Sequence, residues 1–437
     1  MALALGGVRM SDDQNDIPTP GGPSSEARKR RREAQRARVK LQRKRRWAGA
    51  VTVTGLLAVA LAAAWSGGSR SQGGAKSQTS APTSPRPAVL PGGPLAPAAD
   101  GGLAALWAPQ NVVGAQPGTA AAYQAASTRR GLPGYLLIAD RGNNRILIVD
   151  PQGKVVFLYP TPADLAAGRR LFYNDDTFVE PGGRALIANE EDNHAIIQIG
   201  LADHSLQVLF GHPGEVGSDD THLNTPDDAY MLPGGTFTVA DAYNCRILFI
   251  RAHRIVRQYG QSGECHHAPP RFLGAVNGDT PTPDGGVLIS EISGSWIDEV
   301  GPDGRLAFAV AAPVGYPSDP QSLPGARILL ADYSSPGHVL IIDRRGRVLW
   351  RYGASGGYGR MDHPSLAMPL PNGDIAVNDD YRDRVIVVDP RTNRIVWQYG
   401  HTDRPGSAPG YLNTPDGMDF IPAGPHGLPD YAAVVHP

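Results

Sequence analysis

A unit of strand, polar turn, strand, tight turn and strand occurs six times between residues 134 and 400. Residues 136–160 form one copy, LLIADRGNNRILIVDPQGKVVFLYP, and residues 374–400 form the last. Each copy carries an anchor residue, acidic or amide, at the end of its first strand: Asp140, Asn189, Asp241, Glu291, Asp332 and Asp379. A repeat of this length predicts one supersecondary unit per copy, which buries its apolar faces only by stacking on its neighbours.

A second element recurs between the copies and predicts a fourth strand for each unit. It is a turn and a short strand that ends near Pro-Gly-Gly, as in NDDTFVEPGG at 174–183. Six units of four strands predict an all-β fold, a six-bladed β-propeller, because radial closure leaves no long exposed sheet edge. The last such element, at 413–424, is expected to return to residues 136–138 and complete the first blade. A seventh blade built from 103–113 and 431–435 is the alternative.

The repeats resemble those of the NHL family, and residues 138–153, IADRGNNRILIVDPQG, carry the resemblance best. The endings WRYG at 350–353 and WQYG at 397–400 are also similar to blades of quinoprotein-like and arylsulfotransferase-like propellers. The resemblance covers residues 134–424 and implies a six-bladed propeller. It implies no single activity, because propellers of this kind serve many unrelated functions.

The N-terminal part of the chain has the pattern of a membrane anchor. Residues 28–46 hold 12 basic side chains and one acidic side chain, and residues 47–65 contain no charge. Nineteen uncharged, mostly apolar residues are close to the length of one helical span, and basic residues on one side place that side in the cytoplasm. A cleavable secretory signal that ends near residues 62–64 is the alternative.

This pattern predicts four segments. Residues 1–46 form a disordered, basic cytoplasmic tail, 47–65 a transmembrane signal-anchor helix, 66–133 a linker rich in Gly, Ser, Pro and Ala, and 134–437 the propeller outside the cytoplasm. Because the basic run adjoins the apolar segment, we expect it to contact anionic lipid, and we expect no nucleic-acid partner.

Aspartates at the start of the inner strands are expected to gather at the propeller axis. They are Asp175, Asp176, Asp227, Asp228, Asp279, Asp319 and Asp416. Clustered carboxylates repel one another and favour a hard cation such as Ca²⁺. We therefore predict a metal site formed by Asp176, Asp228, Asp319 and Asp416. The alternative is that each aspartate caps its own turn.

When the inner strand is counted as the first of each blade, a second ring is predicted from the residues that open the third strands. This ring is expected to bind anions or sugars on the same face. Its members are Arg145, His194, Arg246, Trp296, His338 and Arg384. Alternatively, the arginines pair with the anchor carboxylates. Four histidines, His222, His266, His267 and His363, belong to loops of this face, and the arylsulfotransferase resemblance implies that one of them would be catalytic.

The two cysteines, Cys245 and Cys265, are expected to form a disulfide. The repeat places one at the start of a third strand and the other just after the following strand, so they are neighbours on one face of one blade. An exported domain permits the bond.

These features favour a binding or scaffold module that engages a protein, peptide or glycan at the channel mouth. The alternative is an extracytoplasmic enzyme that uses the same face, either a metal-dependent hydrolase or lyase or an arylsulfotransferase-like protein. A quinoprotein dehydrogenase is less favoured, because the chain has no adjacent cysteine pair and only some of its blades contain a Trp.

Overall fold

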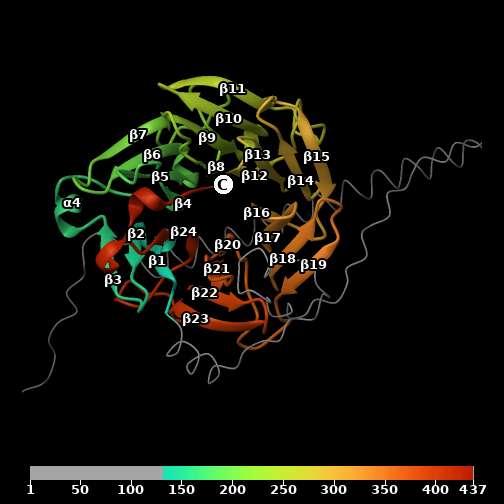
Figure 1. Cartoon of the computed structure of the whole chain (residues 1–437). Coiled ribbons are helices and arrows are strands. Elements are labelled where there is room, and N and C mark those ends of the chain that lie inside the picture. Colours follow the sequence, from blue (N-terminus) through green and yellow to red (C-terminus); the bar gives the residue numbers. More distant parts are fainter. Residues whose placement is uncertain (1–130, 437) are drawn as a thin grey trace, which may run out of the picture. The chain divides into compact units, whose positions relative to one another are not determined.

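In a computed structural model that describes residues 131–436, six four-stranded antiparallel sheets surround a central axis (Figure 1). The innermost strands are β4 (Asn174–Val179), β8 (Pro226–Asp228), β12 (Val276–Pro281), β16 (Pro317–Leu323), β20 (Ala367–Pro369) and β24 (Pro415–Pro422). The second strands are β1 (Gly134–Asp140), β5 (Ala185–Glu190), β9 (Thr236–Asp241), β13 (Val287–Glu291), β17 (Arg327–Asp332) and β21 (Ile375–Asp379). The predicted six-bladed propeller is confirmed.

The outer half of each blade consists of two more strands. The third strands are β2 (Arg145–Val149), β6 (Ala195–Gly200), β10 (Arg246–Arg251), β14 (Trp296–Val300), β18 (His338–Asp343) and β22 (Arg384–Asp389). The outermost strands are β3 (Val155–Tyr159), β7 (Leu206–Gly211), β11 (Arg254–Gly260), β15 (Leu306–Ala311), β19 (Val348–Tyr352) and β23 (Arg394–Gly400). A short helix, α4 (Pro162–Ala166), follows β3.

The ring closes as the sequence predicts. Strand β24 pairs antiparallel with β1, and Leu136 lies opposite Phe420 while Ile138 lies opposite Met418. The first blade therefore contains strands from both ends of the propeller. Residues Tyr431–Ala433 form a 3-10 helix, η6, so this part of the alternative seventh blade is not a strand.

Apolar residues fill the space between neighbouring blades, which explains why most strands are buried on both faces. Every residue of β1 is buried, and so is every residue of β22. Trp350 in β19 is fully buried and donates a hydrogen bond from Nε1 to Oδ1 of Asn393, at 2.7 Å, in the next blade. Lateral packing of this kind stabilises each blade through its neighbours.

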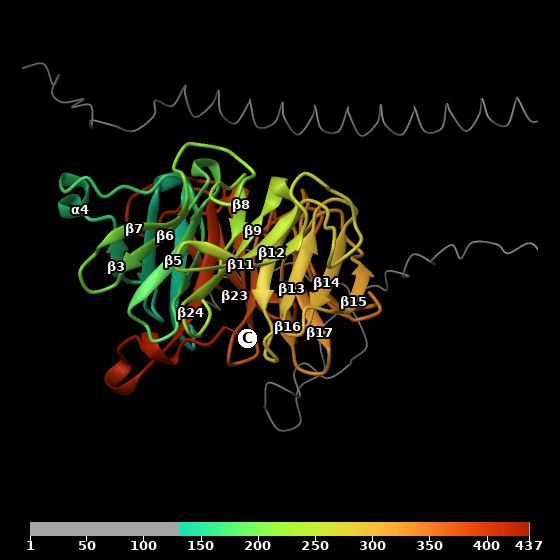
Figure 2. The same ribbon diagram turned by 90° about the horizontal axis from the view of Figure 1, so that it is seen from above.

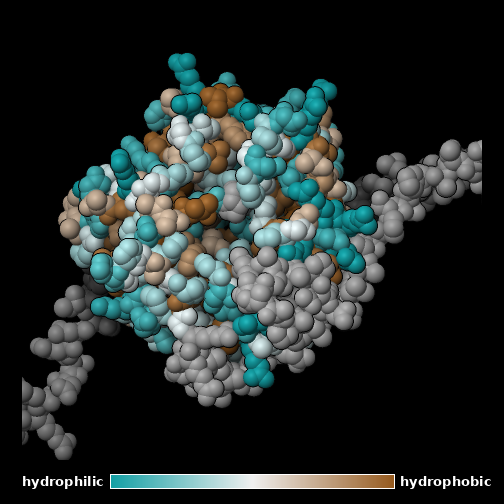
Figure 3. Space-filling view, viewed as in Figure 1, coloured by the Kyte–Doolittle hydropathy of each residue, from teal (hydrophilic) through white to brown (hydrophobic). Residues whose placement is uncertain are grey.

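The two faces of the disc differ. One face carries the turns between second and third strands and the connections between blades, and we call it the connection face. Helix α4 lies on this face (Figure 2). On the opposite face the end of the chain reaches the axis (Figures 1 and 2). There His436 lies 2.9 Å from Asp419, and its ring packs against Phe178 and Tyr230. Much of the visible rim of this face is hydrophilic (Figure 3).

The predicted N-terminal segments 1–46 and 47–65 and nearly all of the linker lie outside the described residues. Within residues 131–436, no helix is long and apolar enough to cross a membrane.

Cys245 and Cys265 are joined by a disulfide that ties the turn before β10 to the connection that follows β11. The bond closes a loop with a sequence separation of 20 residues. Because it restricts the unfolded chain, replacing both cysteines by alanine should lower the free energy of unfolding by about 2–3 kcal/mol. Urea unfolding with and without a reducing agent measures the change. The variant itself should not respond to the reducing agent, and an equal response of the two proteins would contradict the prediction.

Candidate functional site

The inner-strand aspartates gather around the axis, and most of them are buried. Asp176, Asp228 and Asp319 are 4%, 0% and 3% exposed. Burial, together with the charges of Asp319 and Asp228, raises the pKa of Asp176 well above its usual range. Burial and the nearby Asp416 raise the pKa of Asp319 to about 8. Carboxyl groups on four different inner strands therefore share one region and repel one another.

Two glycines leave room for these carboxyl groups. A Cβ atom on Gly278 would lie 2.8 Å from Oδ1 of Asp319, and one on Gly417 would lie 2.7 Å from Oδ1 of Asp176. Both of these oxygen atoms are buried and accept no hydrogen bond. Such oxygens are costly to bury unless a cation or a proton satisfies them.

One arginine, Arg141, reaches into the cluster. Its guanidinium lies 2.7 Å from Asp416 and 3.4 Å from Asp175, and it also pairs with Glu191. Burial alone would lower the pKa of Arg141, but these carboxylates raise it well above its usual value. Burial also acts to raise the pKa of Asp416, yet the charge of Arg141 holds it below the usual value. Asp416 is therefore satisfied as an ion pair.

Three carboxylates have ligand atoms close enough to hold one metal ion. They belong to Asp175, Glu191 and Asp227, and these atoms lie within 4.8 Å of one another. The trio differs from the predicted set of Asp176, Asp228, Asp319 and Asp416. Asp175 and Asp227 lie where the pairing of β4 and β8 with their second strands shifts register, so simple alternation along these strands does not predict which aspartates meet.

Sequence reasoning missed a ring of residues that directly follow the anchors. Glu191 opens the 3-10 turn η2 (Glu191–Asn193) and reaches the axis from there. The same position in the other blades is occupied by Arg141, Ala242, Ile292, Tyr333 and Asp380. Aligning the repeats on their turns would have identified this position.

Aromatic side chains from turns and connections gather near the axis on the connection face, in the region that we call the mouth. The ring of Tyr333 lies 5.2 Å from Tyr316 and 5.0 Å from His363, and His363 lies 4.5 Å from Tyr381. We call these four residues the aromatic wall. Burial, together with the charges of Asp227 and Glu191, raises the pKa of Tyr316 well above its usual range, which places the wall beside the carboxylate trio.

Three arginines of the predicted ligand-binding ring pair with anchor carboxylates, as in the alternative stated above. The pairs are Arg145–Asp140, at 2.6 Å, and Arg246–Asp241 and Arg384–Asp379, both at 2.7 Å. Arg246 and Arg384 are 1% and 0% exposed, so their guanidinium groups offer no surface to an external ligand.

The second blade departs from the predicted register by one residue. Its anchor is Glu190, which accepts hydrogen bonds from the backbone of Phe172 and the side chain of Asn193, whereas Asn189 bonds to the backbone of β8. His194 therefore precedes the third strand instead of opening it, in a left-handed conformation with φ of 57°. Two adjacent glutamates, Glu190 and Glu191, stand at the start of this turn. The sequence alone therefore does not show which residue is the anchor.

The other two members of the predicted ring lie near acidic groups. His338 lies 3.4 Å from its anchor Asp332. Trp296 stacks on His267 at 4.0 Å, and His267 lies 3.1 Å from Glu291. Of the four loop histidines, His363 belongs to the aromatic wall, while His266 packs on Phe272 and His222 lies in the connection that follows β7.

No family model and no curated protein match this sequence. Among solved structures, a Bacteroides caccae protein of unknown function is similar, with 17% identity and a TM-score of 0.46 over 65% of this chain and 98% of that one. A nidogen/laminin complex gives 13% identity and a TM-score of 0.45 over 65% and 97%. A virginiamycin B lyase from Staphylococcus aureus gives 13% identity and a TM-score of 0.40 over 59% and 81%.

Proposed function

We propose that the propeller is a binding module whose mouth on the connection face holds a divalent cation and, with it, a polar ligand. The observation that carries this proposal is the convergence of Asp175, Glu191 and Asp227 within 4.8 Å. Burial raises the pKa of Asp175 and Asp227 well above the usual range, so the trio is short of positive charge even beside Arg141. Ca²⁺ takes six to eight oxygen ligands, and carboxylates are the side chains it prefers.

The ligand would complete the coordination of the cation and rest on the aromatic wall. Three carboxylates leave coordination positions for oxygen atoms of a ligand. Tyr381 is 38% exposed, so its ring is open to a sugar or to a side chain of a partner. Aromatic faces beside carboxylates bind such groups through stacking and hydrogen bonds. This chemistry suits a protein, a peptide or a glycan.

Calcium titration of the purified full-length chain by calorimetry tests the proposal. We expect the Glu191→Gln variant to weaken Ca²⁺ binding at least tenfold, because it removes one charged ligand. Asp192→Asn is the matched control, since the Asp192 side chain is adjacent and 64% exposed. Equal Ca²⁺ affinity of all three proteins would disprove the cation site.

An enzyme that uses the same face is the second candidate, and one contact favours its arylsulfotransferase-like form. His363 Nδ1 lies 2.7 Å from Oδ1 of Asp362, and the imidazole ring packs against Tyr333 and Tyr381. A carboxylate that orients an imidazole is the arrangement of a general base, and the same imidazole would serve as the nucleophile in sulfuryl transfer. Aryl sulfates and aryl esters are suitable probes. Turnover that is lost in His363→Gln while Ca²⁺ binding persists would support this function.

We further propose that the propeller lies outside the cytoplasm, tethered by residues 47–65, with the basic residues before them on anionic lipid. The disulfide of the propeller supports this location, because such bonds persist in oxidising compartments. External protease added to intact cells should digest the propeller and leave residues 1–46 protected. Protection of the propeller would contradict the proposal.

A further inference from the structure

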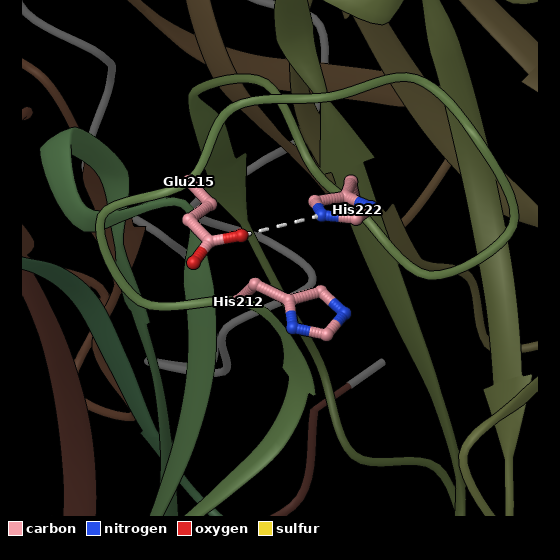
Figure 4. A group of neighbouring side chains, drawn as sticks. All are labelled: His212, Glu215 and His222. Atoms are coloured by element: carbon pink, nitrogen blue, oxygen red, sulfur yellow. Dashed lines mark ion pairs between the residues drawn. The ribbon is translucent and has the colours of Figure 1, made fainter.

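The connection between β7 and β8 brings two imidazoles and a carboxylate together (Figure 4). They belong to His212, Glu215 and His222, and one ligand atom from each lies within 4.8 Å of the others. His222 Nε2 is 3.8 Å from a carboxylate oxygen of Glu215. The two imidazole rings stack, with centroids 4.2 Å apart.

The backbone of this connection fixes the spacing of the three side chains. A tight turn brings Glu215 beside His212, and its amide donates to the carbonyl of His212 at 2.9 Å. The chain then returns, and the amide of Gly217 donates to the carbonyl of Leu223 at 3.1 Å, which places His222 next to the same turn. A Cβ atom on Gly217 would lie 2.6 Å from Cβ of His222, so a glycine is needed at this close approach.

The buried Arg246 holds the returning part of the connection. Its guanidinium donates to the carbonyl oxygens of Asp219, at 3.1 Å, and of His222, at 3.0 Å. Asn244 donates to the carbonyl of Gly217 at 2.8 Å. These donors belong to the next blade, so the position of His222 is set by the body of the propeller rather than by the connection alone.

Asp219 orients the imidazole of His222. Both of its carboxylate oxygens lie 2.9 Å from Nδ1 of His222, which leaves Nε2 directed toward Glu215. A carboxylate behind an imidazole fixes its tautomer and makes the other ring nitrogen a better metal ligand.

We propose that His212, Glu215 and His222 form a binding site for Zn²⁺. Two imidazoles and one carboxylate match a common zinc ligand set, which leaves a fourth, tetrahedral position for water or for a donor from a partner. Imidazole donors favour zinc, whereas the all-oxygen set at the axis suits Ca²⁺. The Glu215 side chain is 73% exposed, so the ion reaches the site directly from solvent.

Zinc titration of the full-length chain in excess Ca²⁺ tests the site independently of the axial carboxylates. The wild-type protein should bind one Zn²⁺, and the double variant Glu215→Gln/His222→Gln should bind it at least 100-fold more weakly. His426→Asn is the control, because His426 is an exposed histidine on a separate segment. Co²⁺ in place of Zn²⁺ should show the visible absorption of a tetrahedral complex. Zinc binding that is unchanged in the double variant would overturn the proposal.

Asp219 is a positioning residue, and its replacement separates orientation from folding. Asp219→Asn should weaken Zn²⁺ binding about 10–100-fold, as is typical when a partner behind a ligating histidine is removed. Asp219→Glu should restore part of the affinity. The thermal midpoints of the metal-free variants should match that of the wild type. Equal Zn²⁺ affinity in Asp219→Asn would show that Asp219 has no role in the site.

Discussion

Replacement of Arg384 by methionine should lower the free energy of unfolding by about 3–5 kcal/mol, because it leaves the carboxylate of Asp379 buried without its cation. Both side chains are fully buried, and Nε of Arg384 lies 2.7 Å from Asp379. The same guanidinium donates to the carbonyls of Tyr358 and Arg360, both at 3.0 Å, so the connection before β20 would also lose its support. Urea denaturation measures the loss.

Arg145→Met is the matched control for this prediction. Arg145 makes the same bond to its anchor, Asp140, but its side chain is 15% exposed. The Asp140 side chain is as buried as that of Asp379. Loss of the partly exposed Arg145 guanidinium nevertheless opens a path for water to this carboxylate, so the loss of stability should be smaller than for Arg384. The double variant Arg384→Met/Asp379→Asn should recover much of the loss, since no buried charge is left unpaired. Equal losses at both arginines would show that burial of the pair is not what matters.

Asp319→Asn should stabilise the propeller in the presence of a chelator, and the gain should grow as the pH rises. Burial and Asp416 raise the folded-state pKa of Asp319 to about 8, against 3.8 for the free side chain. A raised pKa means that the protonated carboxyl stabilises the fold at low pH and that this stability is lost as the pH rises toward 8. Asparagine does not titrate, so its advantage should increase by up to about 1.4 kcal/mol per pH unit.

The backbone at residue 319 suits this substitution. Its φ is 37°, a left-handed conformation that asparagine tolerates well, so the change adds no strain. The neighbouring carboxyl groups that bear on its charge are Asp176, Asp228, Asp279 and Asp416. Thermal unfolding at pH 5, 6, 7 and 8 measures the trend. A gain that is constant with pH would contradict the assignment, and Ca²⁺ should reduce the gain if it neutralises this region.

The repeat in the sequence predicted the number of blades, because each copy of the repeat forms one blade. It also predicted the closure of the ring, because the last inner strand has no outer strands of its own. It also predicted which strands carry the axial aspartates. It failed at the second blade, where two adjacent glutamates, Glu190 and Glu191, hid the register of the turn. The pattern therefore points to Asn189 as the anchor, whereas the structure has Glu190 there, and His194 lies one residue before β6.

The sequence by itself determined the architecture, because the alternation of apolar residues and the spacing of turns are local properties that repeat along the chain. Only the tertiary structure decided which charged groups meet. Arg246 and Arg384 are buried against their anchors, while Glu191 joins Asp175 and Asp227, and His212 joins His222. Such contacts depend on how the turns and connections fold against one another, and the local pattern of the repeat does not fix that.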